Sequence, residues 1–236
     1  MSMNIAGLQK VSTIDYPGEI SCIVFLHGCN FRCGFCYNPD LVLREACEGF
    51  SQEYFFDFLK KRKGKLDAVC ITGGEPLITL DLEFVKKIKE LGFKVKIDTN
   101  GSFPDKLKEL IDNKLIDYIA MDIKSSREFY ARAAGIPVDI SKIERSIKLV
   151  HDFKNSEFRT TIVKRFHDEK VMRELGKWVK KICGEKSSQI FLQGFRKNEE
   201  GMIDMDFLKE QNVSEKYLEE MREVIKNYFC EVGVRC

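Results

Sequence analysis

Short apolar runs alternate with amphipathic stretches along most of the chain. The apolar runs are rich in Val, Ile, Phe and Thr, and their lengths are typical of buried parallel strands. The stretches between them carry apolar residues at the three- and four-residue spacing of a helix. Because predicted strands and helices alternate, the sequence indicates βαβ units and an α/β fold with a parallel sheet. The predicted strands span 20–28, 66–74, 93–101, 116–124, 157–165 and 188–195.

The predicted helices have recognisable ends. Ser51 is a plausible N-cap, Pro104 lies in a first turn, and Gly184 follows the last of these helices. Six βα units are too few for a complete eight-stranded barrel. An open doubly wound sheet and an incomplete barrel both remain possible from periodicity alone. The predicted helices span 51–64, 79–92, 104–113, 140–153 and 168–184.

Composition and charge exclude several classes of protein. The 236 residues are 44% hydrophobic and 32% charged. This excludes a disordered chain, which would lack the apolar surface needed to offset the entropy lost on folding. With 39 basic and 37 acidic residues, the balance favours neither a nucleic-acid nor a membrane surface. No secretory signal or apolar span is visible, so we expect a cytoplasmic protein. The basic run at 60–65 is interpreted as a helix end, with docking to an acidic partner as the alternative.

The cysteines are the compositional outlier. Of the nine, Cys29, Cys33 and Cys36 fall within eight residues, at the spacing C-x3-C-x2-C. Three thiolates in one short loop suit a metal site, and no second cysteine pair supplies the fourth ligand that structural zinc prefers. A [4Fe–4S] cluster with one open iron fits better, while three buried or free thiols are the alternative. The remaining cysteines are interpreted as packing or surface thiols: Cys22, Cys47, Cys70, Cys183, Cys230 and Cys236.

Polar sequence motifs recur where the predicted strands end. The cysteine loop follows the first strand, GGEP (73–76) the second and DTNG (98–101) the third, and MDIK (121–124) closes the fourth. Taken singly, GGEP and DTNG could each be a plain turn, and MDIK could be an ordinary ion pair at a strand end. In parallel α/β folds, however, the carboxyl ends of the strands form one mouth where chemistry collects. The order of the motifs therefore predicts a single shared site.

These motifs together resemble those of the radical S-adenosylmethionine (radical SAM) enzymes, in which the cysteine loop is the cluster motif and GGEP the second motif. Within that superfamily the chain is most similar to the glycyl-radical-enzyme activating enzymes, and it looks like the activating proteins of anaerobic ribonucleoside-triphosphate reductase. The resemblance covers about residues 5 to 195. It is carried by DYPG (15–18), GCNFRCGFCYNPDLV (28–42), ITGGEPLI (71–78), LGFKVKIDTNG (91–101), IDYIAMDIK (116–124) and EFRTTIV (157–163).

The resemblance implies the fold, the cofactors and the reaction. We expect a partial (β/α)6 TIM-like barrel over 1–195, with a short helix–strand extension at 196–236 packed on the same domain. One [4Fe–4S] cluster per chain, held by Cys29, Cys33 and Cys36, reduces bound SAM. Its cleavage yields methionine and a 5′-deoxyadenosyl radical, which removes a hydrogen atom from the substrate. The cofactors carry this chemistry, while the protein binds them, orients them and excludes water.

The resemblance also implies which residues contact SAM. Gly73 and Gly74 allow a close backbone approach to its ammonium group, and Lys124 neutralises its carboxylate or pairs with Asp98. A histidine that some relatives carry after the sixth strand is replaced here by Gln193, so that contact is different or absent. His167 is interpreted as a surface-loop residue. The full predicted set of cofactor contacts is Phe35, Tyr37, Gly73, Gly74, Glu75, Pro76, Asp98, Thr99, Asn100, Asp122, Lys124 and Gln193.

Three functional hypotheses follow. The first is an activase that generates a glycyl radical on a separate enzyme, with anaerobic ribonucleoside-triphosphate reductase as the favoured partner and a flavodoxin or ferredoxin-type protein as reductant. The second is a radical SAM enzyme acting on a small molecule or another peptide. The third is an iron–sulfur electron carrier or a zinc-stabilised binding module, which would not cleave SAM. Neither a nucleic acid nor a membrane is expected as a partner.

Overall fold

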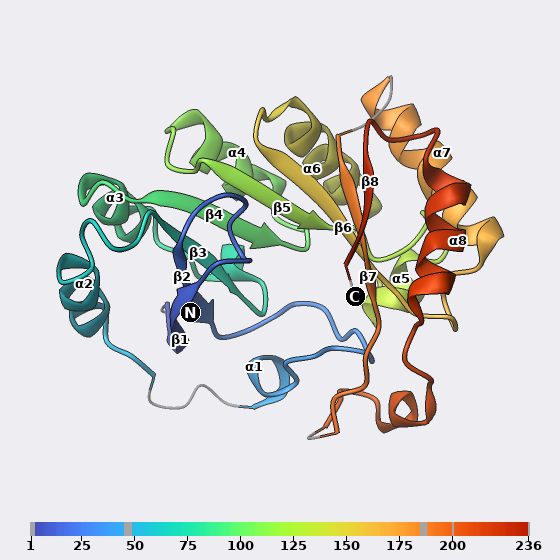
Figure 1. Cartoon of the computed structure of the whole chain (residues 1–236), viewed down its shortest axis with the longest axis horizontal. Helices are drawn as coiled ribbons and strands as arrows, with labels where there is room; N and C mark the ends of the chain where they lie inside the picture. Colours follow the sequence, from blue (N-terminus) through green and yellow to red (C-terminus); the bar gives the residue numbers. More distant parts are fainter. Residues whose placement is uncertain (1–2, 45–48, 185–187, 200, 236) are drawn as a thin grey trace. The chain divides into compact units, whose positions relative to one another are not determined.

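A computed structural model describes residues 3–44, 49–184, 188–199 and 201–235 (Figure 1). The chain forms two compact units. The first comprises Met1–Asn30, Asp40–Thr99 and Asp105–Ile119, and the second comprises Phe31–Pro39, Asn100–Pro104 and Ala120–Cys236. The order of the strands in the sheet follows their order in the chain, from β1 to β8. In the described residues, no helix is long and apolar enough to cross a membrane.

The first unit contains the start of the sheet. β1 (Ile5–Ser12) pairs antiparallel with β2 (Ser21–Leu26), which pairs parallel with β3 (Ala68–Gly73). β3 in turn pairs parallel with β4 (Lys94–Thr99). Most residues of β2 and β3 are buried, as expected for strands covered on both faces.

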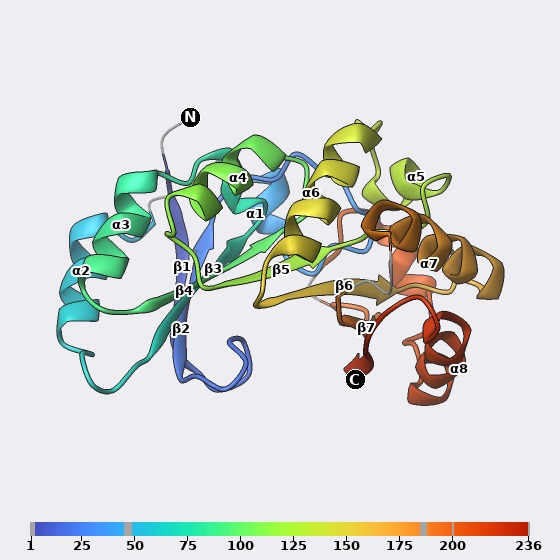
Figure 2. The same cartoon turned by 90° about the horizontal axis from the view of Figure 1, so that it is seen from above.

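The second unit contains the end of the sheet. β6 (Ser156–Ile162), β7 (Ile190–Gly194) and β8 (Val232–Arg235) pair parallel in that order. Figures 1 and 2 show the long helices α7 (Glu169–Cys183) and α8 (Glu215–Ile225) side by side. The division between the units falls inside β5 (Tyr118–Asp122).

Side-chain caps define the helix ends that the sequence predicted. Ser51 accepts a hydrogen bond from the Tyr54 backbone N–H at the start of α2 (Gln52–Lys60), and Asp168 accepts one from the Val171 N–H at the start of α7. Gly184 ends α7 in the left-handed conformation that glycine adopts without strain. The other helices are α1 (Asp40–Leu43), η1 (Pro76–Ile78), α3 (Leu82–Glu90), α4 (Pro104–Asp112), α5 (Tyr130–Ala134), α6 (Ile140–Asp152) and η2 (Met205–Lys209).

The predicted α/β class and its six strands are confirmed, and α8 and β8 form the predicted helix–strand extension. β1 was not predicted. It lies at the edge of the sheet, next to β2, and exposes Gln9, Lys10 and Val11, so it lacks the continuous apolar run of the buried strands. The proposed boundary at residue 195 stays a prediction.

Candidate functional site

In the first unit, the GGEP turn packs directly against the start of the cysteine loop. The Gly74 N–H donates to the Leu26 carbonyl at 3.0 Å, and the Glu75 N–H donates to the Gly28 carbonyl at 2.8 Å. A Cβ on Gly74 would collide with the Gly28 carbonyl oxygen and stand 3.0 Å from the Cβ of Cys29. Gly73 has a φ of 126°, which side-chain-bearing residues rarely adopt. Both glycines are therefore needed for this contact between the second motif and the first cysteine.

Glu75 is a fully buried carboxylate that ties two predicted motifs together. Its Oε1 caps η1 by accepting from the Leu77 N–H at 3.1 Å, and it also accepts from the Thr99 hydroxyl at 2.8 Å. Thr99 belongs to the DTNG motif at the end of β4. The structure thus brings Glu75 and Thr99 into direct contact, and a buried carboxylate that accepts two hydrogen bonds fixes the turn between β3 and η1.

Asp98 forms an ion pair with Lys96, two residues earlier on the same strand. The Lys96 side chain is only 2% exposed and that of Asp98 is 15% exposed. A buried ammonium group needs a counter-charge, and Asp98 provides it. Lys96 was not predicted as a site residue. A lysine among the apolar residues of a buried strand nevertheless indicates a nearby acidic partner.

In the second unit, two glycines hold the rest of the cysteine loop. The Arg32 N–H donates to the Ala134 carbonyl at 2.8 Å, and a Cβ on Gly135 would collide with the Arg32 carbonyl. On the other side, the Asp204 N–H donates to the Gly34 carbonyl at 3.1 Å. A Cβ on Gly34 would stand 2.6 Å from the Phe207 ring. Contacts with the end of α5 on one side and with the segment around η2 on the other therefore hold this part of the loop in place.

Phe35 lies in a cluster of aromatic rings in the same unit. Its ring centroid is 6.0 Å from those of both Phe166 and Phe207. Phe207 also packs at 6.2 Å against Phe195, at the end of β7. Phe166 and Phe207 were not predicted, because they belong to no motif and lie far from the cysteine loop in sequence. This cluster is an apolar wall around Phe35, which lies between Cys33 and Cys36 in the sequence.

The predicted cluster ligands are divided between the units, with Cys29 in the first and Cys33 and Cys36 in the second. Burial raises the pKa of Cys33 to about 11, while the nearby Lys124 ammonium opposes that shift. Burial also raises the pKa of Cys36. Within the residues described, no three His, Cys, Asp or Glu side chains are grouped so as to hold a metal ion. The donor chemistry nevertheless fits an iron–sulfur cluster, because thiols bind such a cluster as thiolates and release their protons to solvent.

Asp122, Lys124 and Arg159 form an ion-pair triad in the second unit. The Lys124 Nζ lies 2.9 Å from Oδ2 of Asp122, and the Arg159 Nε lies 2.9 Å from Oδ1. The pKa of Asp122 would be raised by burial, but the two cations hold it well below its ordinary range. Lys124 thus has Asp122 as its ion-pair partner, while Asp98, the alternative partner in the sequence analysis, pairs with Lys96. Arg159 was missed, although it lies in the quoted EFRTTIV segment.

His167 is buried, with none of its surface exposed, so the interpretation as a surface-loop residue is wrong. The Nε2 of His167 lies 3.0 Å from the Lys124 carbonyl, which only accepts, so Nε2 carries a proton. Its Nδ1 lies 3.0 Å from the Val163 N–H and 3.2 Å from the Val163 carbonyl. Burial lowers the pKa of His167 to about 4, which favours the neutral ring in which Nδ1 accepts from the Val163 N–H. The apolar neighbours Val163 and Phe166, both buried, draw this short loop inward.

The other predicted contacts occupy varied positions. In the Asn100 side chain, Oδ1 accepts from the Ser102 N–H at 2.9 Å, which shapes the turn after β4. Tyr37 is 56% exposed, and its carbonyl accepts from Asn198 at 3.2 Å. Gln193 lies on β7, in register with Thr161 and Arg235. Pro76 is the first residue of η1. Their roles toward SAM stay predictions.

The non-ligand cysteines agree with their interpretation as packing or surface thiols where the structure describes them. Cys22 and Cys70 are buried strand residues, and Cys230 is exposed. Cys47 and Cys236 lie outside the described residues. The Nε2 of His27 donates to the Arg44 carbonyl at 2.9 Å, and His151 lies in α6.

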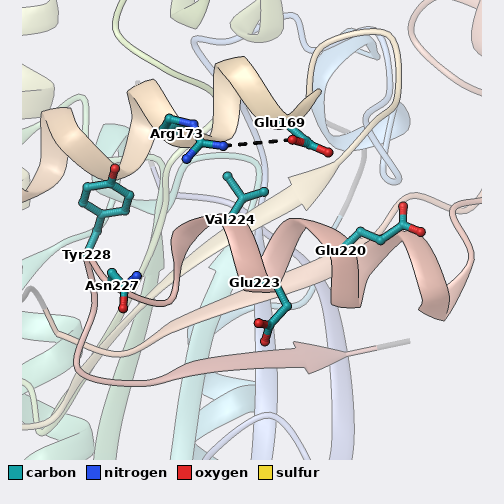
Figure 3. Close-up of a pocket in the computed structure, with 7 residues that line it drawn as sticks. All are labelled: Glu169, Arg173, Glu220, Glu223, Val224, Asn227 and Tyr228. Atoms are coloured by element: carbon teal, nitrogen blue, oxygen red, sulfur yellow. Dashed lines mark ion pairs between the residues drawn. The ribbon is translucent and has the colours of Figure 1, made fainter.

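A separate groove of about 440 Å³ lies between α7 and α8 in the second unit (Figure 3). Tyr228 packs its ring against Gly176, where any Cβ would collide with it. Glu169 and Arg173 of α7 pair across one turn at 4.0 Å. The lining, as the described part of the chain defines it, contains none of the predicted site residues: it comprises Glu169, Arg173, Glu220, Glu223, Val224, Asn227 and Tyr228.

Comparison with known proteins matches this arrangement of motifs to one superfamily. The Radical SAM superfamily matches residues 23–176. A Methanocaldococcus jannaschii protein, whose name places it among the glycyl-radical enzyme activating enzymes, is 36% identical over 245 residues, covering 100% of this chain and 97% of the relative. The pyruvate formate-lyase-activating enzyme of Listeria monocytogenes is 33% identical over 133 residues, which is 51% of this chain and 52% of that enzyme.

A solved structure supports the same assignment at the level of the fold. A domain of the pyruvate-formate lyase-activating enzyme from Bacteroides vulgatus superposes with a TM-score of 0.56 at 17% identity, covering 72% of this chain and 99% of that domain. The chain therefore belongs to the radical SAM superfamily and is an enzyme of that superfamily. Within it, the chain is a homologue of the glycyl-radical enzyme activating enzymes over its full length. The predicted fold of the radical SAM type is confirmed.

Proposed function

We propose that this enzyme generates a glycyl radical on a separate protein, with anaerobic ribonucleoside-triphosphate reductase as the favoured partner. The observation that carries the activase proposal is the full-length similarity to a relative named for glycyl-radical enzyme activation. The choice of partner rests on the sequence motifs alone, from DYPG at 15–18 to EFRTTIV at 157–163.

The proposed cofactors are one [4Fe–4S] cluster and SAM. When bound, they supply a one-electron cleavage of SAM that gives a 5′-deoxyadenosyl radical. Cys29, Cys33 and Cys36 would hold the cluster as thiolates. The Lys124 ammonium near Cys33 favours the thiolate form of that cysteine, as its effect on the thiol pKa indicates. The apolar wall of Phe35, Phe166 and Phe207 would exclude water from this side of the loop.

The remaining predicted contacts divide the work of holding SAM. The Gly73 and Gly74 carbonyls would accept from its ammonium group, because the turn already lies against Cys29. Lys124, held beside Asp122, would meet its carboxylate. Glu75, through its bonds to Leu77 and Thr99, would keep the second motif in place. Asp98 and Asn100 would bind the ribose hydroxyls, and Tyr37 would shield the adenine. Pro76 would stiffen the turn of the second motif, and Gln193 would make an altered contact or none.

The experiment that tests the proposal mixes anaerobically reconstituted protein, a reductant, SAM and a candidate partner. Electron paramagnetic resonance spectra are then recorded. We expect a glycyl doublet with the anaerobic reductase and none when SAM is left out. A doublet with another glycyl-radical enzyme alone would reassign the partner. SAM cleavage stimulated by a metabolite, without any protein radical, would instead favour a small-molecule substrate.

A further inference from the structure

Three successive backbone carbonyls at the end of β5 accept hydrogen bonds from side chains. The sheet ends at Asp122, and the chain beyond it runs through buried surroundings, where an unpaired carbonyl is costly. All three donors are themselves buried. The pairs are Tyr130 Oη to the Asp122 carbonyl (3.5 Å), Thr160 Oγ1 to the Ile123 carbonyl (2.9 Å) and His167 Nε2 to the Lys124 carbonyl (3.0 Å).

His167 is the most constrained of these donors. Its other ring nitrogen, Nδ1, lies 3.0 Å from the Val163 N–H and 3.2 Å from the Val163 carbonyl, so both nitrogens are engaged and the ring is held in place. The backbone carbonyl of His167 accepts from the Tyr217 hydroxyl of α8 at 2.7 Å. A continuous series of hydrogen bonds therefore runs from α8 through His167 to Lys124, whose ammonium pairs with Asp122 at 2.9 Å.

We propose that His167 is a positioning residue for SAM, which it serves by fixing the Lys124 ammonium through the Lys124 backbone carbonyl. This inference rests on the proposed function, in which Lys124 meets the carboxylate of SAM. His167 takes no part in the chemistry and acts only by fixing the position of Lys124. Without the tie at its carbonyl, Lys124 loses a fixed backbone from which to present its ammonium, so SAM binds more weakly while the cluster ligands are untouched.

Two substitutions of similar size separate the hydrogen bond from the volume of the ring. His167→Gln keeps a side-chain N–H donor, whereas His167→Met fills the site without one. We expect His167→Met to weaken SAM binding about tenfold, as the loss of a hydrogen bond to a buried group predicts, and His167→Gln to restore most of it. The measurement is equilibrium dialysis of SAM against the reconstituted protein. His151→Gln on α6 is the matched histidine control and should bind SAM as the wild type does.

Two further measurements keep the proposal testable if His167→Met fails to fold. Tyr217→Phe removes only the hydroxyl that holds the His167 carbonyl, and we expect a several-fold loss of SAM affinity. In the metal-free wild type, long-range ¹H–¹⁵N spectra of labelled histidine should show the neutral Nε2–H tautomer at pH 6, independently of any activity.

The outcomes are distinct from those of the proposed function. Equal SAM affinity in the wild type, His167→Met and Tyr217→Phe would overturn the inference, as would equal losses in His167→Gln and His167→Met at unchanged thermal stability. A charged imidazole at pH 6 would also overturn it. If the wild-type protein itself neither binds nor cleaves SAM, the proposed function fails before any variant is compared.

Discussion

The Nε2 of His167 lies 3.0 Å from the backbone carbonyl of Lys124, and the two residues are linked across 43 positions of sequence. The bond joins the loop after β6 to the segment that carries the MDIK motif. A buried neutral imidazole thus supports the segment that carries the ion-pair triad of Asp122, Lys124 and Arg159. The effects of this bond and of the other buried contacts can be measured in the isolated protein.

The first concerns pH and stability. Burial lowers the pKa of His167 to about 4, against an ordinary value of 6.5 in the unfolded chain. Between these values the unfolded state binds a proton that the native state does not, so stability falls as the pH falls from 6.5 to 4. We expect His167 to account for about 3 kcal/mol of that fall.

Urea unfolding of metal-free wild type and His167→Gln at a series of pH values isolates this effect, because the carboxylates titrate alike in both. The wild type should lose its advantage over the variant as the solution is acidified. Parallel pH profiles for the two proteins would contradict the prediction.

A second prediction concerns Gly74. Gly74→Ala places a Cβ against the Gly28 carbonyl and 3.0 Å from the Cβ of Cys29. We expect the variant to lose about 3 kcal/mol of stability and much of its capacity for iron, since the first cysteine must shift. Iron and sulfide content after anaerobic reconstitution is the measurement. Gly92→Asn is the control, because Gly92 faces open space and asparagine tolerates a positive φ. Full iron loading of Gly74→Ala would refute the account of the GGEP turn.

A third prediction concerns the carboxylate of Glu75. Glu75→Gln keeps an oxygen that accepts from both the Leu77 N–H and the Thr99 hydroxyl, so stability should change by less than about 1 kcal/mol. Glu75→Leu removes the acceptor from both donors and should cost about 2 to 3 kcal/mol. Thermal and urea unfolding compare the two variants. The account is contradicted if Glu75→Gln is as damaging to stability as Glu75→Leu.

A fourth prediction concerns Asp122. Asp122→Asn leaves the part-buried Lys124 and Arg159 cations without their shared counter-charge. We expect a loss of about 2 kcal/mol above pH 5, which disappears at pH values low enough to protonate the wild-type carboxylate. The loss follows from the pKa of Asp122, which the two cations hold below its ordinary range in the native state. A difference that does not change with pH would show that the loss has another cause.

The sequence predicted those parts of the molecule that depend on local pattern. Apolar runs predicted the buried strands, and Ser51 as an N-cap predicted the start of α2, because both signals are local in sequence. β1 was missed because an edge strand with exposed residues lacks a continuous apolar run.

The supporting contacts of the site were harder to predict. The motifs identified Asp122 and Lys124. Arg159 and His167 contact these two residues, and Phe207 contacts the cysteine loop, only in the folded chain, so no local motif identified them. His167 was misassigned because a histidine in a short polar-looking loop gives no sign of burial. Its flanking Val163 and Phe166 are the signal that was available, since both are buried in the structure.

The most direct test of the central claim follows a hydrogen atom. The candidate partner is prepared with deuterated glycine and mixed anaerobically with reconstituted, reduced enzyme and SAM, and the 5′-deoxyadenosine is analysed by mass spectrometry. An activase that abstracts hydrogen from glycine yields 5′-deoxyadenosine carrying one deuterium, together with a glycyl radical on the partner and neither product with Cys33→Ala. Unlabelled 5′-deoxyadenosine and no protein radical would contradict the account.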